Sequence, residues 1–300
     1  MKTNKGLLTA LAFFSVYLFW GGTYIGMKFA IESFPPFLMA AIRHTIAGLI
    51  LLSYAIIKHE VKPNRHQLIQ ASIVGIIMLM FGNGLVAYAE KVIPSSIASL
   101  MITTVPFWIM LLNWRFGDHR KPLKIEVITL LMAFSGIVLL VLQGSSLAVE
   151  QLDPIGMIII VIAAFSWSVG SLYSRFKEVP KSIYYNLSTQ MISGGLVLFI
   201  FSFSIHEAQS FEFSHITSQS LVAMFYLIFF GSIIGYSAYI WLMKNVNPTL
   251  ASSNAFVNPV VALLLGYFLA HEVLSIQSII AAVIIIIAVA ILTLSKKQKA

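Results

Sequence analysis

The sequence predicts an all-α integral membrane protein with ten transmembrane helices in two inverted five-helix repeats. Three observations predict this fold class. Of the 300 residues, 59% are apolar and only 10% are charged, whereas soluble domains carry about 25% charged residues. The apolar residues form continuous runs, and a membrane-spanning helix needs a run of about 20. Finally, residues of the first half recur in the second half at regular offsets.

The apolar runs define the ten expected spans. They are continuous rather than alternating, which favours helices over the strands of a membrane barrel. Short polar or proline-containing segments separate the runs, and none of these segments is long enough to hold a soluble domain. The expected spans are 7–27, 36–57, 67–89, 95–114, 124–142, 154–174, 184–204, 217–241, 249–269 and 275–295.

The positive charges predict the orientation of these spans. Cytoplasmic loops of membrane proteins are rich in Lys and Arg. If the N-terminus is cytoplasmic, all of the 19 Lys and Arg except Lys28, Arg43 and Lys91 fall on the cytoplasmic side. We therefore expect a multi-pass protein of the inner or plasma membrane with both termini in the cytoplasm. Because topology explains the net charge of +8, and no basic stripe accompanies it, we expect no nucleic-acid partner.

An internal duplication is visible in uncommon residues. We expect the first copy to span residues 1–147 and the second to span 148–300. Because five helices are an odd number, the second copy enters the membrane in the opposite orientation, as in many secondary transporters. The pairs matched at one offset are Trp20 with Trp167, Lys28 with Arg175 and Gly48 with Gly195; those at a slightly larger offset are Gly82 with Gly235 and Pro106 with Pro259.

Together these residues resemble a known family over essentially the whole chain. The pattern is similar to that of EamA-type exporters of the drug/metabolite transporter superfamily. Such a resemblance implies export of small metabolites, often amino acids, or of toxic compounds. The residues that carry it are Phe19-Trp20-Gly21-Gly22-Thr23-Tyr24, Pro35-Pro36, Arg43, Tyr88, Pro94, Ala98, Pro106 and Asn258-Pro259.

One departure from the family pattern concerns an acidic position. Family members commonly carry Gly-Glu after the fourth and ninth helices. Here the first copy reads Gly117-Asp118-His119 and the second reads Ala270-His271-Glu272. A role that depends on this glutamate is therefore not transferred to the first copy.

Signatures of enzymes are missing from the sequence. Both aspartates, Asp118 and Asp153, fall in predicted loops, which excludes an intramembrane aspartyl protease. The chain has no His-Glu-x-x-His, no Gly-x-Ser-x-Gly and no phosphate loop. It has no cysteine, and its seven histidines do not pair at metal-ligand spacing within a helix. We therefore expect a protein that is not an enzyme and that uses no metal and no cofactor.

Arg43 and His44 are the most informative polar pair. A charge within the bilayer is costly, so Arg43 either faces a water-filled cavity or extends to the headgroups. His44 either carries protons or only forms a hydrogen bond between helices. No carboxylate is expected at the middle of the membrane, since glutamates such as Glu90 lie near helix ends. Coupling through His44, coupling through an end-placed glutamate, and facilitated transport remain open alternatives.

Aromatic and amide side chains complete the predicted site. Trp20 and Trp167 fall well inside their spans, and aromatic walls suit a small, partly apolar substrate. Buried amides either join helices or bind substrate. Pro106 and Pro259 are expected inside helices, where they mark a transport site or only a packing kink. The predicted substrate-binding residues are Trp20, Thr23, Tyr24, Arg43, His44, Asn83, Tyr88, Trp167, Tyr236 and Asn258.

These observations predict a secondary transporter that exports small metabolites, such as amino acids or related compounds, by alternating access. The alternatives are a multidrug efflux transporter and a non-transporting membrane scaffold. The expected partners are a small-molecule substrate and the lipid bilayer. The sequence leaves the substrate and the oligomeric state open.

Overall fold

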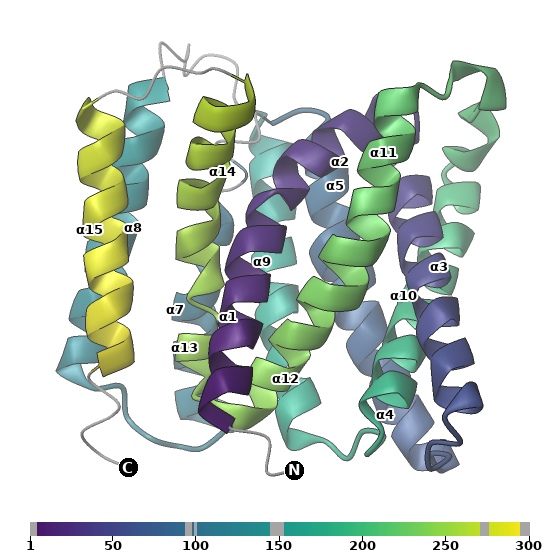
Figure 1. The fold of residues 1–300 in the computed structure, drawn as a ribbon, viewed down its shortest axis with the longest axis horizontal. Helices are drawn as coiled ribbons and strands as arrows, with labels where there is room; N and C mark the ends of the chain where they lie inside the picture. The colour runs from purple at the N-terminus through teal and green to yellow at the C-terminus, as the bar shows by residue number, and fades with distance from the viewer. Residues whose placement is uncertain (1–4, 94–97, 99–100, 145–152, 271–275, 295–300) are drawn as a thin grey trace.

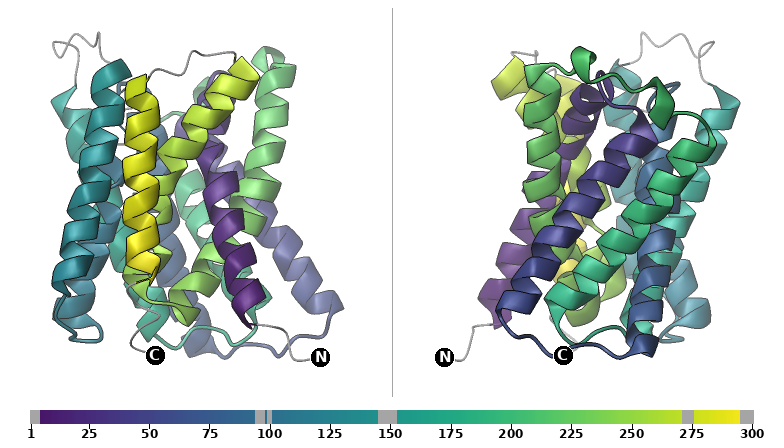
Figure 2. Two further views of the ribbon diagram at one scale, coloured as in Figure 1. Left: turned by 60° about the vertical axis from the view of Figure 1, so that its left-hand side comes forward. Right: turned by 90° about the vertical axis from the view of Figure 1, so that its right-hand side faces the viewer.

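The computed structural model describes residues 5–93, 98, 101–144, 153–270 and 276–294. These residues form helices and connecting turns, and no strand occurs among them. The helices stand side by side in one bundle (Figure 1). The first described helix begins, and the last one ends, at the same end of the bundle (Figures 1 and 2). We call this the proximal end, and the opposite end the distal end.

Within the described residues, six helical segments are long and apolar enough to cross a membrane. The expectation of a helical membrane protein is therefore confirmed, while the full number of ten spans stays a prediction. The six segments are α1 with α2 (Lys5–Gly21, Thr23–Ile31), α3 (Pro36–Ile57), α4 with η1 and α5 (Arg65–Gly75, Ile76–Gly84, Leu85–Ala89), α9 (Pro154–Phe176), α10 (Ile183–Ser204), and α11 with η5 and α12 (Ser218–Tyr226, Leu227–Tyr236, Ser237–Asn245).

Further helices lie where the other four spans are predicted. They are α7 (Val105–Phe116), α8 (Lys124–Gly144), α13 (Pro248–Ala251), α14 (Asn254–Ala270) and α15 (Ile276–Leu294). In Figure 1, α8, α14 and α15 stand upright in the same bundle as the longer segments.

The outer surface of the bundle is apolar, and polar side chains are buried. Phe14 on α1, Ile158 on α9 and Ile200 on α10 are 61%, 59% and 66% exposed. In water, exposed apolar surface costs about 25 cal/mol per Å² relative to burial, but in lipid it carries no such cost. Ser168 and Gln190, by contrast, are buried inside the bundle. This distribution explains how a chain with so few charges is stable in a bilayer.

Helices of the first half (1–147) interlock with helices of the second half (148–300). α3 packs along α10 and α8 along α15, so each of these pairs joins the two halves. α1 contacts η5, α12 and α14, whereas α9 contacts η1, α5 and α7. The contacts that α1 makes with the second half therefore correspond to those that α9 makes with the first.

Glycines allow α10 to approach its neighbours closely. A Cβ at Gly75 of α4 would overlap the backbone oxygen of Gln190 on α10. A Cβ at Gly194 would lie 2.8 Å from the backbone oxygen of Gly75. Small residues at such contacts are typical of helix packing in membranes, where association depends on van der Waals contact.

Two π-helical stretches, η1 and η5, were not indicated by the sequence. They interrupt the third and eighth predicted spans, one in each half. π-Helical turns are rare and occur frequently at functional sites. Both stretches contribute to the cavity described below.

The expectation for Pro106 is corrected by the structure. Pro106 lies in the first turn of α7, directly after the turn at Thr103 and Thr104, and not in a helix interior. At this position the missing N–H leaves no helical hydrogen bond unmade, so proline starts the helix here. Pro259 lies inside α14, as expected.

A glutamate of the second half caps a helix of the first half. The connection from α10 to α11 contains two 3-10 turns, η3 (Ala208–Ser210) and η4 (Phe213–His215). Just before them, the Glu207 carboxylate accepts hydrogen bonds from the backbone N–H groups of Phe37 (3.1 Å) and Leu38 (3.3 Å). The first turn of α3 has no side-chain cap of its own, so Glu207 satisfies its free donors. These hydrogen bonds join the connection between α10 and α11 to the start of α3.

Candidate functional site: a polar and aromatic cavity between the two halves

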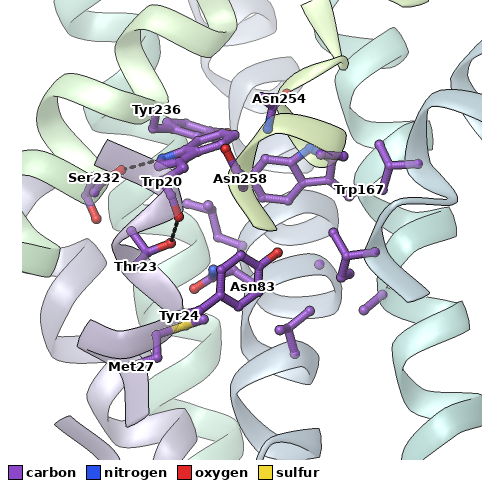
Figure 3. A pocket seen from close by; sticks show the side chains of 18 of the residues that line it. Trp20, Thr23, Tyr24, Met27, Asn83, Trp167, Ser232, Tyr236, Asn254 and Asn258 are labelled. Atoms are coloured by element: carbon purple, nitrogen blue, oxygen red, sulfur yellow. Dashed lines mark hydrogen bonds between the residues drawn. The ribbon is translucent and has the colours of Figure 1, made fainter. Parts of the chain in front are cut away.

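A cavity lies inside the bundle where the two halves meet. Its volume of about 100 Å³ is several times the roughly 10–15 Å³ that one water molecule needs. The first half lines it with α1, α2, α3, η1, α5 and α7, and the second half with α9, η5 and α14. Figure 3 shows Trp20, Asn83, Trp167 and Asn258, from four different helices, around this space.

Most of the predicted site residues come together here. Arg43 is 3% exposed and His44 is 2% exposed, so both face the interior and not the headgroups. The predicted residues that line the cavity are Trp20, Thr23, Tyr24, Arg43, His44, Asn83, Trp167, Tyr236 and Asn258.

Tyr88 is not among the residues that line the cavity, which corrects its predicted position. Its ring stacks on Phe37 with the centroids 5.2 Å apart, and the Lys91 ammonium lies 5.8 Å from the ring centroid. Val86, two residues earlier on the same helix, does line the cavity. Residues two positions apart in a helix point in directions about 200° apart around the axis. When Val86 faces the cavity, Tyr88 therefore faces away from it.

Trp20 and Trp167, the pair matched between the halves, contact each other at the cavity. Their rings lie edge to face with centroids 5.5 Å apart. Tyr239 packs against both, at 5.1 Å from Trp20 and 5.6 Å from Trp167. The Trp20 Nε1–H donates to the backbone oxygen of Gly231 (2.8 Å), and the Trp167 Nε1–H donates to Tyr239 Oη (3.1 Å). These bonds hold the two indoles in fixed orientations.

Arg43 places one cation in the cavity wall. Its Nε–H donates to Ser232 Oγ on η5 at 2.7 Å. Its Nη1 is buried and has no hydrogen-bond partner among the described residues. A Cβ at Gly231 would lie only 2.8 Å from Arg43 Nη2, so glycine is needed for the guanidinium to lie against η5. The guanidinium is thus held on one edge and has donors left on the other.

His44 joins two helices by a hydrogen bond. Its Nε2 lies 3.2 Å from the amide oxygen of Asn83 on η1. Because that oxygen only accepts, Nε2 carries the proton, and the Nδ1 of a neutral ring is an acceptor. Nδ1 is buried and without a hydrogen-bond partner in the described part of the chain. This geometry supports the interhelical role that was one of the two alternatives for His44.

Asn254 and Asn258 add acceptors from α14. Both line the cavity, and the side-chain oxygen of each lacks a hydrogen-bond partner among the residues described. They face the same space as the free donors of Arg43. The cavity therefore offers a guanidinium, two amide oxygens and aromatic walls to a bound molecule.

One wall of the cavity is fixed by a buried polar chain. The Tyr236 Oη–H donates to Gln190 Oε1 at 2.6 Å, and Gln190 Nε2 donates to Asn186 Oδ1 at 2.8 Å. Sequence reasoning did not find this chain, because Gln190 and Asn186 have no feature that distinguishes them from surface polar residues. Ser232 was missed too, although a serine after Gly231 in a very apolar run is a visible signal.

The acidic position at which the chain departs from the EamA pattern lies away from the cavity. Asp118 accepts a weak hydrogen bond from Asn113 Nδ2 (3.4 Å) just after α7. Its counterpart segment, His271 and Glu272, lies outside the described residues. The described residues contain no cluster of three or more potential metal ligands.

A bundle of membrane-spanning helices around a polar internal cavity is the arrangement of a membrane transport protein that binds its substrate between helices. The chain belongs to the EamA-like transporter family, whose model matches residues 7–142 and 154–294. It is therefore a multi-pass membrane transporter that acts on a small molecule.

Relatives agree with this family. The chain is 36% identical over 287 residues to "Uncharacterized inner membrane transporter YedA" of Escherichia coli (strain K12), covering 95% of this chain and 90% of that protein. It is 22% identical to "Uncharacterized transporter YoaV" of Bacillus subtilis (strain 168), covering 92% and 93%. A solved structure described as "Crystal structure of protein" has the same fold, with a TM-score of 0.77, 21% identity, and coverage of 97% and 99%.

Proposed function

We propose that this protein is a secondary transporter that exports small metabolites by alternating access, with the substrate bound in the cavity between the two halves. The observation that carries the proposal is the cavity itself. Arg43, the two tryptophans and the two α14 asparagines meet there from both halves, and several of their polar atoms have no partner among the described residues. Polar atoms at membrane depth mark substrate pathways.

The packing of the halves supports an inverted repeat. Exchanging each helix of residues 1–147 with its counterpart in 148–300 turns the contacts of α1 with η5, α12 and α14 into those of α9 with η1, α5 and α7. It leaves the pairs α3–α10 and α8–α15 unchanged. This exchange is what a two-fold axis in the membrane plane produces. In such transporters the substrate lies at the repeat interface and the two copies move against each other.

The lining suggests the chemistry of the substrate. The free edge of the Arg43 guanidinium suits a carboxylate, since charge-assisted and bidentate hydrogen bonds are strong. The amide oxygens of Asn254 and Asn258 accept from an ammonium group, and Trp20 and Trp167 enclose a short apolar part. An amino acid or a related small zwitterion satisfies all three contacts.

Multidrug efflux is the second candidate, and the aromatic lining is what favours it. A site for varied apolar compounds would bind through Trp20, Trp167 and Tyr236 and would not need Arg43. A strict requirement for Arg43 therefore separates metabolite export from multidrug efflux.

The loop charges support both termini in the cytoplasm. Under this orientation the proximal end faces the cytoplasm and the distal end faces outward. Export then moves the substrate from a proximal opening to a distal opening of the same cavity.

The test is metabolite profiling with matched arginine variants. Cells that overexpress the protein should accumulate one group of small carboxylate-bearing compounds outside. Arg43→Ala should abolish this export, and Arg43→Lys should restore it only partly because the planar fork is lost. Arg120→Ala, which changes an exposed loop arginine, is the control and should export normally. Normal export by Arg43→Ala at equal membrane abundance would refute the site.

A further inference from the structure

Glu90 is a buried carboxylic acid that does not line the cavity. It follows directly after the span Arg65–Ala89, whose last helix, α5, lies toward the distal end (Figure 1). Both carboxylate oxygens are buried, and neither has a hydrogen-bond partner in the described part of the chain. A buried, unpaired carboxylate ion is so costly that the group takes up a proton instead. Glu90 is therefore neutral in this conformation.

Glu90 stands at the distal edge of the cavity. Val86 lies four residues earlier on the same face of the chain and lines the cavity. One helical turn of about 5.4 Å thus separates Glu90 from the cavity wall. Tyr24 also lines the cavity and is close enough to Glu90 for an electrostatic interaction. A short movement of the distal helix ends would place Glu90 in contact with water.

In the part of the chain that the structure describes, no cation on α2, or next to Glu90 in the sequence, pairs with the Glu90 carboxylate. Tyr24 is the titratable group of α2 that interacts with it, and a neutral phenol supplies no positive charge. Lys28, one turn further along α2, is exposed. Lys91 is adjacent in sequence, but its ammonium lies over the Tyr88 ring.

The other elements packed against α5 are η1, α3 and α9. η1 contains no titratable residue. The ionisable groups at the centre of α3 are Arg43, held by Ser232, and His44, held by Asn83. At the start of α9, the Asp153 carboxylate accepts from the backbone of its own helix. Among the described residues, Glu90 forms no ion pair with any of them.

Burial also determines the pH at which the Glu90 carboxyl loses its proton. It raises the pKa of Glu90 from 4.5 to about 8, because the surroundings disfavour the charged form. Once water reaches the carboxyl, its pKa returns toward the ordinary value. Between these two values the closed conformation binds more protons than the open one, so a rise in pH favours opening.

We propose that Glu90 is the proton-binding site that controls the distal opening of the transport cavity. When the distal end opens, the carboxyl O–H bond breaks, the electron pair stays on the carboxylate, and the proton passes to water on the distal side. When Glu90 takes up a proton from that side, the distal end closes again. The proposal rests on the proposed transport function, because it assigns a proton to the opening step of that cycle.

The absence of native cysteine makes a direct test possible. Val86→Cys places one thiol on the cavity wall below Glu90, and a membrane-impermeant thiol reagent is added on the distal side. The labelling of Ser214→Cys, on an exposed distal loop, measures how the reactivity of a thiol itself changes with pH. The labelling of Val86→Cys is divided by it. Corrected labelling of Val86→Cys should rise at least about fivefold between pH 6 and about pH 9, because ionisation of Glu90 favours opening. Labelling that does not change with pH would overturn the proposal.

Two glutamate variants identify the titrating group. Adding Glu90→Gln to Val86→Cys should abolish the pH response and keep labelling low, since the amide stays neutral. Glu32→Gln, which changes an exposed glutamate on the distal side, should keep the full response. An equal rise with and without Glu90→Gln would overturn the assignment.

A second measurement covers the case in which Glu90→Gln does not insert. Infrared difference spectra of the protein should then show a protonated-carboxyl band that disappears over the pH range in which labelling rises, and a mismatch of the two ranges would overturn the proposal. Because labelling needs no substrate, the result is independent of the export assay. Export without a pH response would refute the proton site alone, and a pH response without export would refute the transport function.

Discussion

Arg43 places a positive charge in the wall of the cavity. An arginine at the centre of a membrane helix costs about 2.5–3.5 kcal/mol by insertion measurements. One hydrogen bond to a charged group returns about 1.5–3 kcal/mol, which the Ser232 hydroxyl supplies. Nη1 has no partner among the described residues, so an acceptor on a bound molecule would offset more of this cost. We infer that this unmet donor is the source of substrate affinity.

Gly231 controls the position of this guanidinium. We predict that Gly231→Ala leaves the protein folded but lowers export, because the new Cβ would lie 2.8 Å from Arg43 Nη2 and displace it from Ser232. Loss of a charged hydrogen bond of about 1.5–3 kcal/mol corresponds to roughly tenfold or more in affinity. The control is Gly26→Ala, whose Cβ would meet side-chain atoms of Leu227 at 3.2 Å and of Tyr226 at 3.4 Å and would not touch Arg43. Export that is equal in the two variants, at equal abundance, would contradict this role of Gly231.

Tyr236 links the cavity wall to Gln190. We predict that Tyr236→Phe keeps the ring but lowers stability by about 1–3 kcal/mol, because the buried Gln190 Oε1 loses its donor. Tyr88→Phe should leave stability unchanged, since that ring acts by stacking on Phe37. Thermal unfolding of the purified variants in detergent measures the difference. Equal melting temperatures for the two variants would show that the Gln190 bond contributes nothing.

For single residues, the sequence predicts a place in the site when a charged or aromatic side chain interrupts an apolar run. A charge such as Arg43, and indoles such as Trp20 and Trp167, are recognisable inside long apolar runs, and the structure brings them to one cavity. The burial of Glu90 was not predictable, because a glutamate beside Lys91 at the end of a run is typical of the membrane surface. Only the structure shows that its carboxylate oxygens are covered.

At the scale of helices, close approach depends on positions without a side chain. Gly75 of α4 meets the backbone of Gln190 on α10, and backbone atoms cannot turn away as a side chain does. Gly22, between α1 and α2, lies against the Tyr226 side chain of α11, and Gly235 of η5 lies against the Trp20 side chain of α1. Small residues at such positions let membrane helices approach closely.

Gly75→Val tests this packing. We predict loss of folded protein from the membrane, because the added atoms overlap the α10 backbone and overpacking typically costs about 1–3 kcal/mol or more. Ile69→Ala changes a residue on the same helix that is 47% exposed to lipid, and it should fold normally. The yield of monodisperse protein after extraction is the measurement. A normal yield of Gly75→Val would show that α4 and α10 are not so closely packed.

The helix ends and breaks were less predictable than the helices. Apolar length predicted α3 and α10 well, since lipid imposes it. The π-helical stretches η1 and η5 line the cavity, and no residue type in the sequence predicts a π-helical turn. For Pro106, the sequence does not distinguish a kink inside a helix from a helix start, because both tolerate proline in an apolar context.

The whole molecule consists of two halves, and helices of each half pack against helices of the other. α1 inserts among η5, α12 and α14, while α9 inserts among η1, α5 and α7. Trp20 and Trp167 meet where these two arrangements join. Under the proposed alternating access, one half would rotate against the other and open a cavity at this junction to either end.

The orientation of the whole molecule is predicted from its loop charges. Lys62→Cys lies on the loop between α3 and α4, and Ser214→Cys lies on the distal connection before α11; both positions are exposed. In intact cells, an impermeant thiol reagent should label Ser214→Cys at once and Lys62→Cys only after the membrane is opened. The reverse pattern would invert the assignment of the proximal and distal ends.

The central claim is that the cavity between the halves carries a small molecule across the membrane. Flux through liposomes that contain only the purified protein tests it most directly, using the compound that metabolite profiling identifies. We predict saturable flux that is absent from empty liposomes and lost in Arg43→Ala but kept in Arg120→Ala. Flux that persists unchanged in Arg43→Ala, or that the unmodified protein does not support at all, would contradict the account.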